Sequence, residues 1–155
     1  MSILSLRMEL KAIRDCPAKM SKKEAIDQIA ALASEVYDLP ATHVSARLDA
    51  REGIGSTGFG HCVAIPHARI GQLNHCVGVF LRFANPIDFE AHDGKPVDLV
   101  FALLSPEKAG VDHLKALAGI SRFLRDENMT AKLRGAAGPD ALYALITGQR
   151  EQQAA

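Results

Sequence analysis

The sequence has no excess of charge of either sign, since 18 lysines and arginines balance 18 aspartates and glutamates. A balanced chain creates no long-range field that would collect nucleic acid or anionic lipid, so a partner must be recognised by a local patch. We therefore expect no nucleic-acid partner.

Cysteines are few, and long apolar runs are lacking. Cys16, Cys62 and Cys76 are odd in number and form no CxxC pair, which argues against a secreted disulfide scaffold and for a reducing compartment. No run reaches the roughly 20 apolar residues that span a bilayer. Residues 1–6 form too short an apolar run for a signal peptide. The chain is expected to be cytoplasmic, without membrane insertion.

A chain of 155 residues with 48% hydrophobic content fits one compact domain over residues 1–155. Helices are predicted by apolar spacing and by capping signals, the clearest being the capping box at Ser21–Glu24. The predicted helices cover about 21–39, 41–50, 112–124, 127–134 and 140–146. The tail from about residue 149 is expected to be less ordered.

Strands are predicted in the middle of the chain. In residues 76–83, every second position is apolar (Val77, Val79, Leu81 and Phe83), with Gly78, Phe80 and Arg82 between them. Residues 97–104 are almost continuously apolar and suit a strand buried on both faces. Residues 62–65 are expected to form a short strand and 87–89 an edge strand, with a hairpin-like connection between the two longer strands. Helices before and after this group predict an α/β three-layer sandwich, with a mixed β-sheet of about four or five strands flanked by helices on both faces.

A glycine-rich stretch, Gly53-x-Gly55-x-x-Gly58, matches the dinucleotide-binding fingerprint literally. The match fails on context. That fingerprint follows a hydrophobic strand and is followed about 20 residues later by an acidic residue. Here the preceding residues are predicted to be helical and are charged, and the region around Gly78 is an apolar strand. A Walker A loop is also excluded, since no Lys-Ser/Thr follows the glycines. Nucleotide binding is therefore not expected.

The stretch instead suits a flexible loop over residues 53–60 that leads through the strand at 62–65 to Pro66 and His67. Glycines allow an anion to approach the backbone, and Ser56 and Thr57 add hydroxyl and amide donors. Pro66 fixes the chain, so that the imidazole is presented from a stiff strand end. From spacing alone, an ordinary turn beside a surface or core histidine is the favoured interpretation.

Residue identity favours the anion site. Residues 51–60 (REGIGSTGFG) and 64–67 (AIPH) resemble the active-site signature of the mannitol/fructose-class IIA components of the bacterial phosphoenolpyruvate-dependent phosphotransferase system, and most of all the nitrogen-regulatory IIA proteins. The resemblance continues through residues 86–89 and 95–104 to the His113-Leu114 pair. It implies a mixed sheet between helical layers.

By matching position, the resemblance implies that His67 is the phosphorylated residue, His113 the second active-site histidine and Arg51 the basic residue beside the phosphoryl group. A neutral imidazole with a pKa near 6.5 attacks an activated phosphoryl group without a metal, so no metal or cofactor is expected. Arg51 supplies a charged fork, and Ser56 and Thr57 are candidate phosphoryl-binding residues.

Several assignments remain open. If Asp112 caps its helix, His113 stands in the first turn, where an anion is favoured; alternatively, it only packs locally. Ile54 and Phe59 either form an apolar docking patch for the donor protein or are buried, and Arg69 is either a second basic site residue or a solvated arginine. The chain departs from the family at three positions. The family often has asparagine where this chain has His61. It usually has glycine in place of Cys62 and often has glycine in place of Ala68.

A metal site is the weaker interpretation of the histidines and cysteines. The spacings of His61, Cys62, His67, His75 and Cys76 match no standard zinc module. His61 and Cys62 are neighbours in a predicted strand and would point to opposite faces. His43, His75 and His92 are expected to face solvent.

The leading hypothesis is a phosphohistidine carrier that accepts its phosphoryl group from an HPr-like (NPr-like) phosphocarrier. Its targets would be regulatory proteins such as sensor kinases or potassium-transport proteins. One alternative is a sugar-specific (fructose or mannitol) IIA that passes the phosphoryl group to a IIB partner for uptake. Another is an interaction module that is not phosphorylated.

Overall fold

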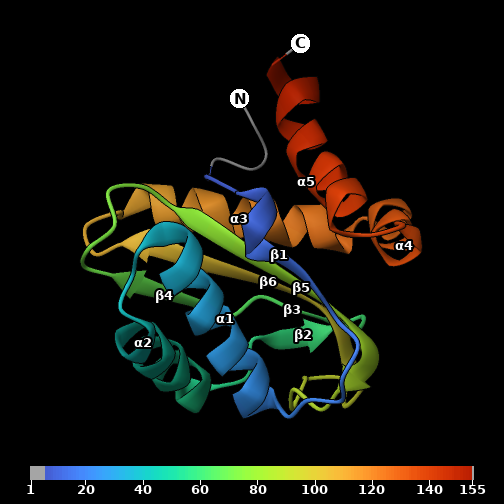
Figure 1. The fold of residues 1–155 in the computed structure, drawn as a ribbon, viewed down its shortest axis with the longest axis horizontal. Coiled ribbons are helices and arrows are strands. Elements are labelled where there is room, and N and C mark those ends of the chain that lie inside the picture. Colours follow the sequence, from blue (N-terminus) through green and yellow to red (C-terminus); the bar gives the residue numbers. More distant parts are fainter. Residues whose placement is uncertain (1–5, 155) are drawn as a thin grey trace.

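The protein is a three-layer α/β sandwich in which a mixed sheet separates two groups of helices (Figure 1). The computed structural model describes residues 6–154, with side chains through residue 148. The strands are β1 (Ile13–Cys16), β2 (Gly58–Gly60), β3 (Val63–Ala64), β4 (His67–Ile70), β5 (Val77–Ile87) and β6 (Val97–Pro106). The helices are the 3₁₀ turn η1 (Leu10–Ala12), α1 (Lys22–Tyr37), α2 (Ala41–Ile54), α3 (Val111–Arg125), α4 (Glu127–Gly135) and α5 (Pro139–Ala154).

The antiparallel pair β5 and β6 forms the centre of the sheet, whose strand order is β1-β5-β6-β3-β2, with β4 also paired to β6. All residues of β6 except Asp98 and Pro106 are buried, as its continuous apolar run predicts. Helices α1 and α2 cover one face and α3 the other (Figure 1). Both long strands, their antiparallel pairing and the layered fold are therefore confirmed.

The sheet contains six strands rather than four or five, because short strands escape the sequence pattern. Strand β1 was not predicted. Its ends, Ile13 and Cys16, are buried, whereas Arg14 and Asp15 between them are not, so four residues give no clear alternation. The strand forms by parallel pairing with β5. The Arg82 guanidinium of β5 also donates two hydrogen bonds, of 2.6 and 2.9 Å, to the Asp15 carboxylate.

The glycine-rich stretch is more ordered than predicted. Gly53 belongs to α2 and Gly58–Gly60 form β2, so the predicted flexible loop shrinks to residues 55–57. The predicted strand at 62–65 is also shorter. His61 and Cys62 have left-handed backbone φ angles of 57° and 65° and form the turn between β2 and β3. This conformation favours glycine, which agrees with the expectation, drawn from the resemblance, of glycine at position 62.

The predicted edge strand at 87–89 is wrong. Ile87 is the last residue of β5 and pairs with Val97, while Phe89 is fully buried outside any strand. An apolar residue can thus be drawn into the core from a loop, which periodicity alone does not distinguish from a strand.

The predicted helices all form, with changes at several ends; α2, predicted to end near residue 50, extends to Ile54. The capping box of α1 is present in both directions between Ser21 and Glu24. Helix α3 begins at Val111 with Gly110 as its N-cap, so Asp112 is a first-turn residue and not the cap. Helix α5 extends to Ala154. The order of the tail side chains from 149 onward lies outside the described residues.

No helix within residues 6–154 combines the length and the hydrophobicity that crossing a bilayer requires.

Candidate functional site

His67 lies at the first position of β4, where a proline interrupts the strand. Residues 63–64 and 67–70 pair with successive parts of β6, and Pro66, which has no N–H, separates them. The carbonyl of Ile65 lies 2.9 Å from Nδ1 of His67. A carbonyl only accepts, so Nδ1 carries the imidazole proton and Nε2 keeps its lone pair.

Nε2 of His67 faces a guanidinium group. Nε of Arg51 donates a hydrogen bond of 3.2 Å to it, and Nη1 of the same side chain donates to the carbonyl of Gly55 at 2.8 Å. Burial lowers the pKa of His67 most, the hydrogen bond to the Ile65 carbonyl raises it, and the Arg51 charge lowers it. The imidazole is therefore neutral at neutral pH, and its unprotonated Nε2 accepts the hydrogen bond from Arg51.

Helix α2 brings Arg51 to this place by its periodicity. Val44 and Leu48 are fully buried on the sheet side, which leaves Arg47, Arg51 and Ile54, spaced by four and three residues, on one stripe beside β4. Sequence reasoning missed Arg47, although its helical spacing from Arg51 was the available signal. Its side chain donates to the carbonyl of Arg69 at 3.1 Å and pairs with Glu107.

His113 lies in the first turn of α3, on the face of the sheet opposite to α2. Its ring centroid lies 5.7 Å from that of His67, and its side chain is buried, with Nδ1 2.7 Å from Oγ of Ser105. Burial lowers the pKa of His113 most, followed by the charge of Arg69 and by the neighbouring His67, which disfavours a second protonated ring beside it. Two neutral imidazoles and one guanidinium thus meet from α2, β4 and α3.

Two cavities adjoin His67. The first, of about 350 Å³, is rich in cationic groups, and its lining is Arg47, Ala50, Arg51, Ile54, His67, Ala68, Arg69 and His113. The second, of about 460 Å³, has a single arginine in its lining and is lined among others by Ser56, Thr57, Phe59, Ile65 and Leu114. His67 and Arg51 belong to both. The first cavity has the charge expected of an anion site.

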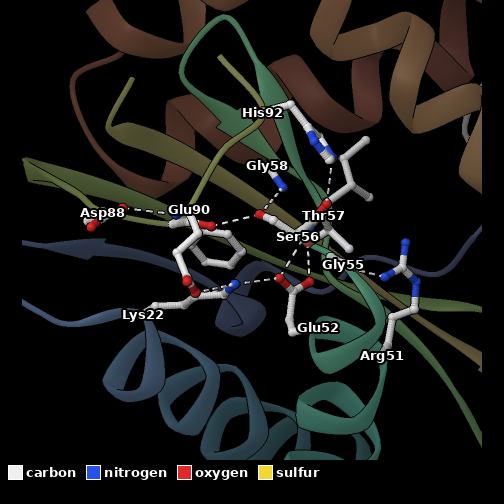
Figure 2. A network of polar contacts seen from close by, with 12 residues as sticks. Lys22, Arg51, Glu52, Gly55, Ser56, Thr57, Gly58, Asp88, Glu90 and His92 are labelled. Carbon is white, nitrogen blue, oxygen red and sulfur yellow. Dashed lines mark hydrogen bonds and ion pairs between the residues drawn. The ribbon is translucent and has the colours of Figure 1, made fainter. Parts of the chain in front are cut away.

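Ser56 and Thr57 do not point their hydroxyl protons at His67. The Ser56 hydroxyl donates to the carbonyl of Phe89 at 2.7 Å, and the Thr57 hydroxyl donates to the carboxylate of Glu52 (Figure 2). Both hydroxyl protons are thus used inside the protein. These hydroxyl groups stabilise the loop, and the assignment of Ser56 and Thr57 as phosphoryl-binding residues stays a prediction.

Glu52 organises this loop, and sequence reasoning missed it. Its carboxylate, 6% exposed, pairs with Lys22 of α1 at 2.9 Å and accepts from the backbone N–H of Thr57 at 3.2 Å (Figure 2). Lys22 also lies 4.8 Å from the centre of the Phe89 ring. Glu52 therefore joins α1 to the loop whose Gly55 carbonyl orients Arg51. The only signal in the sequence is an acidic residue beside Arg51.

We expect Glu52→Gln to lower the free energy of unfolding by about 2 kcal/mol, because it leaves Lys22 without its buried counter-charge. The matched control is Asp49→Asn on the same helix, which removes an exposed carboxylate paired with Lys23 at 2.6 Å. That change should cost less than about 0.5 kcal/mol. Urea denaturation measures both. Equal losses in the two variants would show that Glu52 has no special structural role.

Large apolar side chains surround the site on the outside. Ile54 is 84% and Phe59 41% exposed, so the alternative that they are buried is excluded. Val111 and Leu114 at the start of α3 are also exposed, and neither was predicted. Ile54, Phe59 and Leu114 line the two cavities and form the apolar rim of the site, a feature typical of protein docking surfaces.

The other predicted residues lie as follows. Arg69 lines the first cavity and donates to the carbonyl of Glu107 at 3.4 Å. Ala68 lines the same cavity, whereas His61 and Cys62 occupy the β2–β3 turn. His43, His75 and His92 are exposed, and the His92 ring bonds the carbonyl of Ser56. Within the part of the chain that the structure describes, no group of three or more metal-ligating side chains is suitably placed.

The chain matches the family described as "Phosphoenolpyruvate-dependent sugar phosphotransferase system, EIIA 2" over residues 9–149. It is 48% identical over 126 residues to the nitrogen regulatory protein of Bradyrhizobium diazoefficiens, covering 81% of this chain and 82% of that protein. It is also 38% identical over 129 residues to the fructose-specific EIIA component of Haloferax volcanii, covering 81% of each. The crystal structure of the nitrogen regulatory protein IIA-Ntr of Neisseria meningitidis has a TM-score of 0.83 at 33% identity, covering 90% of this chain and 96% of that one.

Proposed function

Because the chain belongs to the EIIA 2 family of the phosphoenolpyruvate-dependent sugar phosphotransferase system, we propose that it carries a phosphoryl group on Nε2 of His67. The observation that supports this most is the state of that imidazole. Nδ1 is bonded to the Ile65 carbonyl at 2.9 Å, while Nε2 presents its lone pair to Arg51 at 3.2 Å. The nucleophilic nitrogen is thereby defined before any partner binds.

The transfer follows from this arrangement. The Nε2 lone pair attacks the phosphorus of a phosphohistidine on the donor, the donor's P–N bond breaks, and its electron pair returns to the donor imidazole. Nε2 bears no proton, so no general base is needed. The His67 ring becomes cationic, and its Nδ1–H stays bonded to the Ile65 carbonyl, which stabilises that charge.

Arg51 and His113 stabilise the transferred group. A loose phosphoryl transition state spreads its charge over the equatorial oxygens, so catalysis depends on fixed positive groups and donors around them. As Nε2 forms its bond to phosphorus, the Arg51 guanidinium loses that acceptor and turns to the phosphoryl oxygens. The first cavity, with three arginines in its lining, offers room for those oxygens.

The donor is proposed to be an HPr-like (NPr-like) phosphocarrier that docks on the apolar rim, including Ile54 and Phe59, with Arg69 as a further polar contact. We place the reaction in the cytoplasm, in keeping with the free thiols of the described cysteines. The similarity at 48% identity to a protein named "Nitrogen regulatory protein" supports a regulatory role, with sensor kinases or potassium-transport proteins as proposed targets that bind according to the state of His67.

The second candidate function is sugar uptake, supported by the 38% identity to a fructose-specific EIIA component. In that role the phosphoryl group would pass from His67 to a IIB partner. Both functions would use the same site on this chain. They differ only in the protein that responds to, or receives, the phosphoryl group of His67.

Incubation with phosphoenolpyruvate and the upstream phosphotransferase proteins tests the proposal. Intact-mass spectrometry should show one added phosphoryl group that is lost in acid. A fructose-specific EIIA in the same mixture controls for an active donor. If only that control is phosphorylated, the chain is an interaction module instead. The phosphorylated protein is then offered a fructose-class IIB domain, and rapid transfer to it would favour uptake over regulation.

A further inference from the structure

A buried chain of hydrogen bonds reaches His113 from the interior of the sheet. Ser105, near the end of β6, is fully buried, and its Oγ lies 2.7 Å from Nδ1 of His113. Cys76, which directly precedes β5 and is also buried, directs Sγ to the same oxygen at 3.5 Å. One hydroxyl, shielded from water, therefore joins a thiol to an active-site imidazole.

The proton positions in this chain follow from the acceptors around the Ser105 hydroxyl. Within the described residues, that hydroxyl contacts only the Cys76 thiol and Nδ1 of His113. Sulfur accepts weakly, so Nδ1 of His113 is the one strong acceptor for the Ser105 proton, with or without the thiol. A neutral imidazole has one N–H, so a ring that accepts at Nδ1 carries its proton on Nε2. Burial lowers the pKa of His113 and keeps the ring neutral. His113 lines the cationic cavity together with His67, and its Nδ1 edge is tied to the core, so the Nε2 edge is the one available to that cavity.

We infer that Ser105 is a positioning residue that holds His113 with its proton on Nε2, where this N–H donates to the phosphoryl group carried by His67. The inference rests on the proposed phosphoryl-carrier function and adds a residue to its site. Without the hydroxyl, Nδ1 of His113 has no partner in the core, so the ring can turn and its proton can move to Nδ1. The donor then faces the phosphoryl oxygens for only part of the time.

Nitrogen NMR of the His113 ring reads the arrangement without any phosphoryl transfer. In the wild type, Nε2 should be protonated and Nδ1 should show the shift of a hydrogen-bonded acceptor. In Ser105→Ala, the Nδ1 signal should move to that of a free acceptor and the Nδ1–H form should appear. The single-turnover transfer rate should fall about tenfold, the value of one hydrogen bond, while the affinity for the unphosphorylated donor is unchanged. Ser105→Thr, which keeps the hydroxyl, should restore both signal and rate.

Cys76→Ala is the matched control, because it removes a buried side chain from the same hydrogen-bond chain but keeps the contact between Ser105 and His113. It should leave the Nδ1 signal and the transfer rate unchanged. A wild-type His113 with its proton on Nδ1 would overturn the inference, and so would a Ser105→Ala protein with unaltered signal and rate. If Ser105→Ala does not fold, the wild-type spectrum and the Ser105→Thr rate still decide. A wild type that accepts no phosphoryl group would instead reject the proposed function, with the NMR result standing separately.

Discussion

The His67→Ala variant is expected to accept no phosphoryl group from a donor that phosphorylates the wild type fully. The replacement removes the only imidazole whose Nε2 lone pair faces the Arg51 guanidinium, at 3.2 Å, in the described part of the chain. Because the nucleophile itself is lost, the remaining groups of the site cannot compensate. Intact-mass spectrometry and the acid-labile phosphate content measure the result.

His113→Ala is the informative control for this variant. His113 is close to His67, with 5.7 Å between the ring centroids, but its Nδ1 is tied to Ser105 in the core. His113→Ala should therefore slow phosphorylation without abolishing it. In the wild type, the phosphoryl group should be found on Nε2 of His67, because Nδ1 donates to the Ile65 carbonyl. A fully phosphorylated His67→Ala protein, or phosphate on Nδ1, would contradict the mechanism.

The local setting of His67 could be predicted from the sequence only in part. Pro66 predicts a stiff strand end, and the structure has His67 at the first position of β4. The bond from Nδ1 to the Ile65 carbonyl could not be predicted. This bond depends on the direction in which the Ile65 carbonyl points between β3 and β4. That direction is determined by the pairing of both strands with β6.

Sequence patterns alone could not predict that Arg51 and His113 lie next to His67. Helical spacing predicts which face of α2 Arg51 occupies, but not that this face adjoins β4. The resemblance to a family supplied that neighbourhood, and the structure brings the three side chains together. For Ser56 and Thr57, residue type alone gave an incomplete prediction. Their residue types suit anion binding, but the acceptors that use their hydroxyl protons become neighbours only in the fold.

We expect Arg51→Ala to slow phosphoryl transfer to His67 by about a hundredfold to a thousandfold, the usual cost of removing a fixed donor to transition-state charge. The side chain is partly exposed at the end of α2, so the fold should persist. Arg51→Lys should recover only part of the rate, because an ammonium group lacks the fork that reaches both the Gly55 carbonyl and a phosphoryl oxygen.

Arg47→Ala is the matched control for this prediction. Arg47 lies one turn earlier on the same stripe of α2 and lines the same cavity, but its hydrogen bonds go to Arg69 and Glu107 rather than to His67. If the cavity acts only through its summed positive charge, Arg47→Ala and Arg51→Ala should slow rapid-quench single turnovers equally. If Arg51 acts through its contact with the reacting nitrogen, Arg47→Ala should cost less than about tenfold, the scale of a solvent-screened charge. The contact of Nε with Nε2 favours the second outcome, and equal rates in the two variants would remove Arg51 from its assigned role.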